Sequence, residues 1–302
     1  MTAAIETTEL AKTYGSTVAL AALSMRVERG EVFGFLGPNG AGKTTAVKLL
    51  LGLARRTGGT GSVLGAPLGD RRIRAKIGYL PEQFRYQPWL RADEVIDFHR
   101  RLSGVSASDP RTATPTLLAS VGLASRRNDH VGTFSKGMQQ RLGLAVALVG
   151  SPDLVVLDEP TSALDPVGRS EVRVLVRAIA DRGATVFLNS HLLTEVERVC
   201  DRVAIVDRGR IVAAGRPDDL VEDSGVRIVV SGLDAPADVA ARFGSVDEDG
   251  VGLRVGCRPD DVSDLVAALV AAGGRVHAVE PLRTTLEDRF LALVAPTHVS
   301  GT

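Results

Sequence analysis

Short apolar runs alternate with longer amphipathic stretches through about the first 220 residues. Residues 31–36, 154–157 and 185–188 are mostly apolar runs of the kind that form strands buried in a parallel sheet. A helix is predicted to begin at Asp165-Pro166, an N-cap followed by a proline in the first turn, and to stop at Gly183. This alternation predicts a layered α/β domain.

The pattern changes near residue 224. Before that point, two apolar strands flank Asp207-Arg208-Gly209-Arg210 as a hairpin, and Pro217 begins a short helix. After it, we expect a strand, a helix, two strands, a helix, a strand and a last helix, at residues 226–231, 236–243, 245–248, 251–256, 260–272, 275–280 and 285–294. This order predicts a small ferredoxin-like α+β domain with one extra helix. Thr284 and Glu287 have capping-box spacing for the last helix.

The predicted domain boundaries follow from this change of pattern. Residues 1–224 form the α/β domain, and residues 225–295 form a separable C-terminal domain with a regulatory or dimerisation role. Residues 296–302 are predicted to be a disordered tail.

The composition narrows the class of protein. The charges of the 36 basic and 36 acidic residues cancel, so no overall electrostatic field favours a nucleic-acid partner. The two cysteines, Cys200 and Cys257, match no metal-binding spacing. They indicate a reducing compartment, or they simply fill small apolar spaces in the core. The first residues lack the pattern of a signal peptide, and the longest apolar stretch, 142–150, is far shorter than the roughly 20 residues of a membrane span. We therefore expect a cytoplasmic chain.

Residues 37–44 carry the first chemical signal, a complete G-x-x-x-x-G-K-[ST] phosphate-binding loop. It follows the strand at 31–36 and precedes an amphipathic helix at 45–51, as this motif requires. The glycines let backbone N–H groups point at phosphate oxygens. Lys43 is expected to reach the β- and γ-phosphates, and the Thr44 hydroxyl to bind Mg²⁺. The chain is therefore predicted to bind a nucleoside triphosphate.

Two carboxylates, Asp158 and Glu159, end the apolar strand at 154–157. Beside a phosphate-binding loop, the first can hold Mg²⁺ through its water shell and the second can polarise an attacking water. Asp-Glu is also a common dipeptide, so the prediction depends on its pairing with the loop.

Further segments resemble one family. They are Lys-Thr-Tyr-Gly at 12–15, Tyr-Leu-Pro-Glu-Gln at 79–83, Thr-Phe-Ser-Lys-Gly-Met-Gln-Gln-Arg at 133–141, Asp-Glu-Pro-Thr-Ser-Ala-Leu-Asp-Pro at 158–166 and Leu-Asn-Ser-His at 188–191. In this order, they are similar to the adenine-stacking aromatic, Q-loop, signature, Walker B with D-loop and switch histidine of ATP-binding-cassette (ABC) ATPases. The resemblance covers residues 5 to about 220. It implies a P-loop ABC-type ATPase fold with a helical subdomain, with ATP and Mg²⁺ as cofactors.

The resemblance also implies roles for single residues. Glu159 would be the general base and His191 would contact the γ-phosphate, while Ser135 and Gly137 would bind the γ-phosphate of the opposite protomer. The implied catalytic residues are Lys43, Gln83, Glu159 and His191. The implied Mg²⁺ ligands are Thr44, Gln83 and Asp158. The implied nucleotide-binding residues are Tyr14, Gly37, Pro38, Asn39, Gly40, Ala41, Gly42, Lys43, Thr44, Thr45, Ser135 and Gly137.

The signature departs from the commonest form of the family. Phe134, Lys136 and Met138 stand where Leu, Gly and Gln are usual. The serine and the second glycine remain, so contact with phosphate is expected to survive. Lys136 either adds a positive charge near the phosphates of the opposite site or is a solvated residue at a helix start.

A single cassette without membrane helices resembles subunits that form head-to-tail homodimers. The resemblance implies that the dimer binds a separate transmembrane permease, which consists of two copies or two halves, at the cytoplasmic face of the membrane. Leu-Glu-Asp-Arg-Phe-Leu at 286–291 resembles the drug- and polysaccharide-type exporter ATPases. The predicted function is ATP hydrolysis that powers export; the alternatives are an importer subunit and a non-transport ABC ATPase acting on ribosomes or DNA.

Aromatic residues at 84–90 are expected to contact the permease. The alternative is that Trp89 fills the core of the helical subdomain.

Overall fold

A computed structural model describes residues 3–105, 113–162, 164–221, 223–248, 252–283 and 285–294. The chain divides into two compact units, a first over Met1–Pro217 together with Leu293–Thr302 and a second over Asp218–Ala292. The predicted tail at 296–302 lies outside the described residues.

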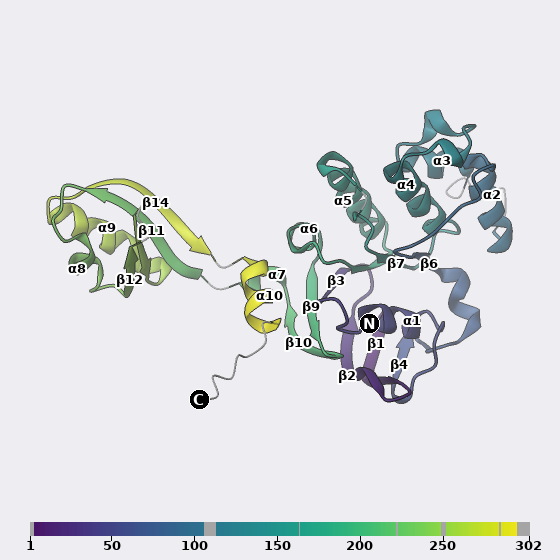
Figure 1. The fold of residues 1–302 in the computed structure, drawn as a ribbon, viewed down its shortest axis with the longest axis horizontal. Coiled ribbons are helices and arrows are strands. Elements are labelled where there is room, and N and C mark those ends of the chain that lie inside the picture. The colour runs from purple at the N-terminus through teal and green to yellow at the C-terminus, as the bar shows by residue number, and fades with distance from the viewer. Residues whose placement is uncertain are drawn as a thin grey trace. The chain divides into compact units, whose positions relative to one another are not determined.

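The first unit is built around a six-stranded sheet in the order β10-β9-β3-β8-β7-β6 (Figure 1). All neighbouring strands are parallel except β9 and β10, which form the predicted hairpin. Every residue of β3, β7 and β8 is buried, which explains why these strands read as continuous apolar runs. The strands are β3 (Val32–Leu36), β6 (Ile77–Leu80), β7 (Leu154–Asp158), β8 (Thr185–Asn189), β9 (Arg202–Asp207) and β10 (Arg210–Gly215).

Both faces of this sheet are covered. Phe33 and Phe35 share one buried cluster with α1 (Lys43–Leu50) and the second sheet. On the other face, a Cβ on Gly34 would lie 2.7 Å from a methyl of Val196 in α6 (Leu193–Val199), so only glycine fits there. The second sheet is antiparallel in the order β2-β1-β4-β5, with β1 (Ile5–Tyr14), β2 (Thr17–Val27), β4 (Gly58–Val63) and β5 (Ala66–Pro67).

Three helices form a group that Figure 1 draws apart from α1. They are α2 (Ala92–Leu102), α3 (Thr114–Ser120) and α4 (Lys136–Ala147), and they contact one another. The predicted helix after Asp165 is α5 (Pro166–Asp181), and Pro217 begins α7 (Pro217–Leu220) as expected. Short 3₁₀ helices are η1 (Arg71–Lys76), η3 (Ala124–Arg126), η4 (Val131–Thr133) and η5 (Pro259–Asp261).

The aromatic segment before α2 contains partly buried and exposed rings. Trp89 is 67% exposed, so the interpretation of Trp89 as a core filler is wrong. Tyr86 instead packs between Phe84 and His99, at ring-centroid distances of 5.3 and 6.0 Å. Burial raises the pKa of the Tyr86 hydroxyl well above its usual range.

The second unit has a four-stranded antiparallel sheet in the order β12-β13-β11-β14. Its elements are β11 (Asp223–Ser231), α8 (Pro236–Ala240), β12 (Ser245–Glu248), β13 (Leu253–Gly256), α9 (Val262–Ala271), β14 (Arg275–Arg283) and the final helix α10 (Leu286–Val294). The predicted order of strands and helices is confirmed, although β11 begins earlier than expected. Fully buried Ile228, Val255, Leu265 and Leu269 give this unit a core of its own.

The capping prediction for the last helix is wrong by one position. Thr285 caps α10, because the Asp288 amide donates to the Thr285 hydroxyl at 3.1 Å and the Thr285 amide donates to the Asp288 carboxylate at 2.8 Å. Asp288 has the reach to close this box from the third helical position. Thr284 lies outside the described residues. Across the described ranges, no helix is long and apolar enough to cross a bilayer.

Candidate nucleotide site

The phosphate-binding loop connects the end of β3 to the first turn of α1. Gly40 and Gly42 have φ values of 83° and 101°, and Gly42 is the N-cap of α1. A side chain on Gly42 would collide with the carbonyl oxygen of Ala19, so the motif glycine is required by both backbone conformation and space. The N-terminus of α1, with its free N–H groups, therefore faces the inside of the loop.

Lys43 turns back into this loop. Its ammonium donates to the carbonyl oxygens of Gly37 at 2.6 Å and Pro38 at 3.1 Å, and the residue is 9% exposed. Burial lowers the pKa of Lys43, and the carboxylates of Glu159 and Asp158 partly oppose that shift. The structure therefore places the lysine charge where the loop and both strand-end carboxylates meet. The remaining loop residues, Pro38, Asn39 and Ala41, and the first-turn residues Thr44 and Thr45 lie where the motif predicts.

Asp158 ends β7 and is 2% exposed. The side-chain amide of Asn189, at the end of the neighbouring strand β8, donates a hydrogen bond to its carboxylate. Burial raises the pKa of Asp158, and the nearby Glu82 and Glu159 raise it further, whereas Asn189 and Lys43 lower it. A bound cation would offset this burial of negative charge.

The oxygen atoms available suit a hard cation such as Mg²⁺. Within the described ranges, no three His, Cys, Asp or Glu side chains are grouped as a metal site. Mg²⁺ does not need such a cage, because it is usually held by one or two carboxylates, substrate phosphates and water. The Asp158 carboxylate and a Thr44 hydroxyl beside a phosphate-binding loop fit that pattern.

Glu159 is paired with His191. The Glu159 carboxylate lies 2.7 Å from Nδ1 of His191, while the Glu159 side chain is 10% exposed and that of His191 56%. The backbone of Glu159 has φ 53°, a left-handed conformation that costs roughly 1–3 kcal/mol for a residue with a side chain. Its amide donates to the Asn189 carbonyl at 2.9 Å, which helps to hold this strained turn. The two residues predicted to be catalytic are therefore in direct contact.

Sequence reasoning assigned no role to two residues of this site. Asn189 lies inside the segment that resembles the switch histidine, but its contact with Asp158 depends on β7 and β8 being neighbours. Gln140 in α4 is 4% exposed and donates to the Glu159 carbonyl at 3.4 Å. The signature segment contained Gln140, but its contact with the backbone of Glu159 depends on how α4 packs beside the end of β7.

The structure does not bring Ser135 and Gly137 to the loop of their own chain. The Ser135 hydroxyl accepts a hydrogen bond from the Met138 amide at 3.2 Å as the N-cap of α4, and its side chain is exposed. Figure 1 shows α4 within the separate helical group. No described contact joins either residue to the phosphate-binding loop.

Two further residues of the predicted site, Tyr14 and Gln83, are exposed. Tyr14, at the end of β1, is 48% exposed, and the Lys12 ammonium lies 4.5 Å from its ring centroid. Gln83 is exposed and, with Glu82 and Lys136, lines a hollow of about 620 Å³. Lys136 thus lies across from the segment after β6.

Together, the loop on a parallel sheet, the buried lysine and the strand-end carboxylates define a P-loop nucleotide-hydrolysing fold. Residues 20–162 match the family model described as ABC transporter. An uncharacterised ABC transporter ATP-binding protein of Synechocystis sp. is 38% identical over 95% of this chain and 83% of its own length. Nod factor export ATP-binding protein I of Burkholderia thailandensis is 36% identical over 96% of this chain and 97% of its own. A solved ATP-binding subunit of an ABC transporter is 31% identical with a TM-score of 0.66, covering 72% of this chain and 92% of that one.

The chain therefore belongs to the ABC transporter ATP-binding proteins, and it is an ATPase. The expected ABC-type α/β fold of the first unit is confirmed.

Proposed function

We propose that this chain hydrolyses Mg²⁺-ATP between two copies of itself and thereby powers export of a substrate through a separate membrane permease. The observation that carries the proposal is the convergence of the Lys43 ammonium, the buried Asp158 carboxylate and the Glu159–His191 pair at one edge of the sheet. These are the groups that phosphoryl transfer to water needs: charge neutralisation, a cation ligand and a base.

Each residue has a distinct task in this reaction. Lys43 and the N–H groups of the loop would bind the β- and γ-phosphates, and Tyr14 would stack on adenine. Mg²⁺, held by Asp158 and Thr44 with Gln83 beside it, would neutralise charge on the phosphates. Glu159 would orient the attacking water and accept its proton, while His191 holds the Glu159 carboxylate in place and donates toward the γ-phosphate.

A second copy of the chain would complete the site. Ser135 and Gly137 begin α4 and offer a hydroxyl, free N–H groups and the positive helix end, but they have no described contact with the loop of their own chain. A head-to-tail dimer brings them to the γ-phosphate of the partner.

The exposed apolar residues around α2 support a permease contact on this part of the cassette. Trp89, Phe98 and Leu102 are 67%, 53% and 68% exposed, and the last two are four residues apart on one face of α2. Exposed aromatic residues are enriched at protein interfaces. Tyr86 packs on His99 and is less exposed than Trp89.

The second unit is proposed to be a ferredoxin-like domain that regulates the dimer. Its order of elements, β11-α8-β12-β13-α9-β14, and its antiparallel sheet order support this assignment.

The direction of transport is supported by a relative. Over 96% of its length, the chain is similar to a protein named Nod factor export ATP-binding protein I.

Purification of the tagged full chain from detergent-solubilised membranes tests the proposal. We expect a multispanning protein to co-purify and to stimulate ATP hydrolysis. Trp89→Glu should abolish this association and leave the basal ATPase rate unchanged, whereas Val174→Glu, at a residue of α5 that is 69% exposed, should change neither. Co-purification with ribosomes or nucleic acid instead would overturn the proposed function.

A further inference from the structure

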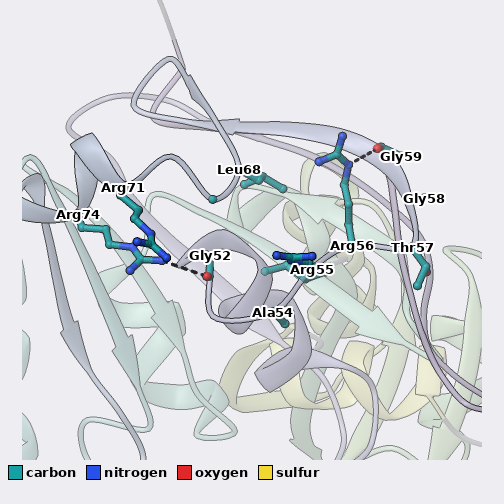
Figure 2. A pocket seen from close by; sticks show the side chains of 12 residues that line it. Gly52, Ala54, Arg55, Arg56, Thr57, Gly58, Gly59, Leu68, Arg71 and Arg74 are labelled. Atoms are coloured by element: carbon teal, nitrogen blue, oxygen red, sulfur yellow. Dashed lines mark hydrogen bonds between the residues drawn. The ribbon is translucent and has the colours of Figure 1, made fainter.

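A hollow lined by arginines lies at the carboxyl end of α1, the helix whose amino end carries the phosphate-binding loop (Figure 2). Its volume is about 730 Å³, which is within the usual range for small-molecule sites. The side chains that surround it include Arg55, Arg56, Arg71 and Arg74 but no aspartate or glutamate. We call this feature the arginine hollow.

Two of its arginines are held by backbone oxygens. Arg74 donates to the carbonyl of Gly52 at 3.2 Å, and Arg56 donates to the carbonyl of Gly59 at 2.7 Å. A carbonyl orients a guanidinium without cancelling its charge. These contacts therefore position two positive charges and leave them available to a negatively charged group.

The other two arginines, Arg55 and Arg71, are exposed, and their side chains make no hydrogen bond or ion pair within the described residues. The neighbouring carboxylate of Asp70 is occupied by Arg72, with contacts of 2.6 and 3.1 Å. Hydrogen bonds from Arg72 lower the pKa of Asp70 to about 2. Asp70 is not among the residues that line the arginine hollow, and no other carboxylate lines it.

Glycines shape the wall of the arginine hollow. Gly52 and Gly69 have φ values of 67° and 89°, and a Cβ on Gly52 would lie only 2.9 Å from Cα of Gly69. The two backbone segments can approach so closely because Gly52 carries no side chain, whereas a Cβ on Gly69 would meet no atom within 4 Å.

We propose that the arginine hollow binds a phosphate group that carries more than one negative charge, with Arg55 and Arg71 as its principal ligands. A planar guanidinium donates two parallel hydrogen bonds to a phosphate, and several arginines around one hollow suit a multiply charged group. This site is separate from the nucleotide loop, and it does not depend on the proposed role in export. The alternative is that the four arginines are a solvated surface without a ligand.

Isothermal titration of the ADP-loaded full chain with pyrophosphate tests the proposal, because ADP occupies the nucleotide loop. We expect one further binding event. Arg55→Ser combined with Arg71→Ser should weaken it about tenfold or more, since each bond to a charged group contributes strongly. Arg29→Ser combined with Arg198→Ser removes the same charge from exposed positions elsewhere and should leave binding unchanged.

A second arm distinguishes a free anion from a lipid headgroup. Flotation with phosphatidylcholine vesicles, with and without phosphatidic acid, supports a lipid headgroup if binding requires phosphatidic acid together with Arg55 and Arg71. The proposal is overturned if neither pyrophosphate nor phosphatidic acid binds, or if both double variants lose binding equally. Thermal unfolding confirms that each variant is folded, and retained ATP hydrolysis by Arg55→Ser/Arg71→Ser separates this result from any failure of the proposed function.

Discussion

The backbone N–H of Gly209 donates a hydrogen bond to the carbonyl oxygen of Ala41, with 2.9 Å between nitrogen and oxygen. Gly209 lies in the turn between β9 and β10, with φ 74°, and Ala41 belongs to the phosphate-binding loop. The Gly209 carbonyl in turn accepts from the amides of Ala21 and Ala22 in β2, at 3.1 and 3.5 Å. One turn therefore ties the phosphate-binding loop to the second sheet.

Gly209→Ala should weaken ATP binding by roughly fivefold, equivalent to about 1 kcal/mol for a lost hydrogen bond. The new Cβ would lie 2.7 Å from both the Ala21 nitrogen and Cα of Leu20, so the turn must move away and its bond to Ala41 must lengthen. Titration with a fluorescent ATP analogue measures the change. Gly183→Ala is the matched control, because Gly183 has φ 92° but no atom within 4 Å of a Cβ. Equal effects of both changes would show that backbone strain alone is responsible.

Glu159→Gln should keep the affinity for ATP and reduce the hydrolysis rate by about 10²–10³-fold, because only the attacking water needs the base. The ATP-bound dimer should then accumulate, as measured by size-exclusion chromatography. Near-normal hydrolysis would remove Glu159 from the role of base.

The contact between Glu159 and His191 predicts a non-additive double-mutant cycle. Adding His191→Ala to Glu159→Gln should lower the hydrolysis rate much less than His191→Ala does in the natural chain, because the two residues act as one unit. Full additivity of the two losses would mean that the pair does not cooperate.

Lys43→Ala and Ser135→Ala should each reduce ATPase activity when present alone. Mixing the two proteins should restore part of it, because one site of a mixed head-to-tail dimer then contains neither change. Activity against mixing ratio measures the recovery. A rate independent of protein concentration, with no recovery on mixing, would argue for a site made by one chain.

A chain that ends at Val221 should fold and bind ATP, because the residues proposed to contact phosphate lie before position 192 and the second unit has its own core. We expect its dimerisation or its ATPase rate to change about severalfold, measured by sedimentation and phosphate release. Loss of ATP binding by the folded, shortened chain would show that the second unit supports the nucleotide site.

The sequence by itself determined the parts of this protein that depend on local signals. The buried strands of the parallel sheet, the N-cap at Asp165 and the loop that begins at Gly37 could all be read from neighbouring residues, since buried strands, helix caps and phosphate-binding turns each need particular residues close together in the chain. The carboxylates at the end of β7 could be placed beside that loop because carboxyl ends of parallel strands share one edge. The order of strands and helices after residue 224 could be predicted for the same reason, because each of these elements also depends on residues close together in the chain.

Only the tertiary structure decided which distant residues meet. Glu159 pairs with His191, Gln140 reaches the Glu159 carbonyl and Gly209 supports Ala41, and each contact joins separate elements whose distance depends on strand order and packing. The same holds for exposure: Tyr86 and Trp89 are close in sequence, yet packing against His99 partly buries the first and leaves the second in solvent. The arginine hollow arises likewise from two segments that approach where Gly52 meets Gly69, because steric room between segments is a property of the folded chain and not of either segment.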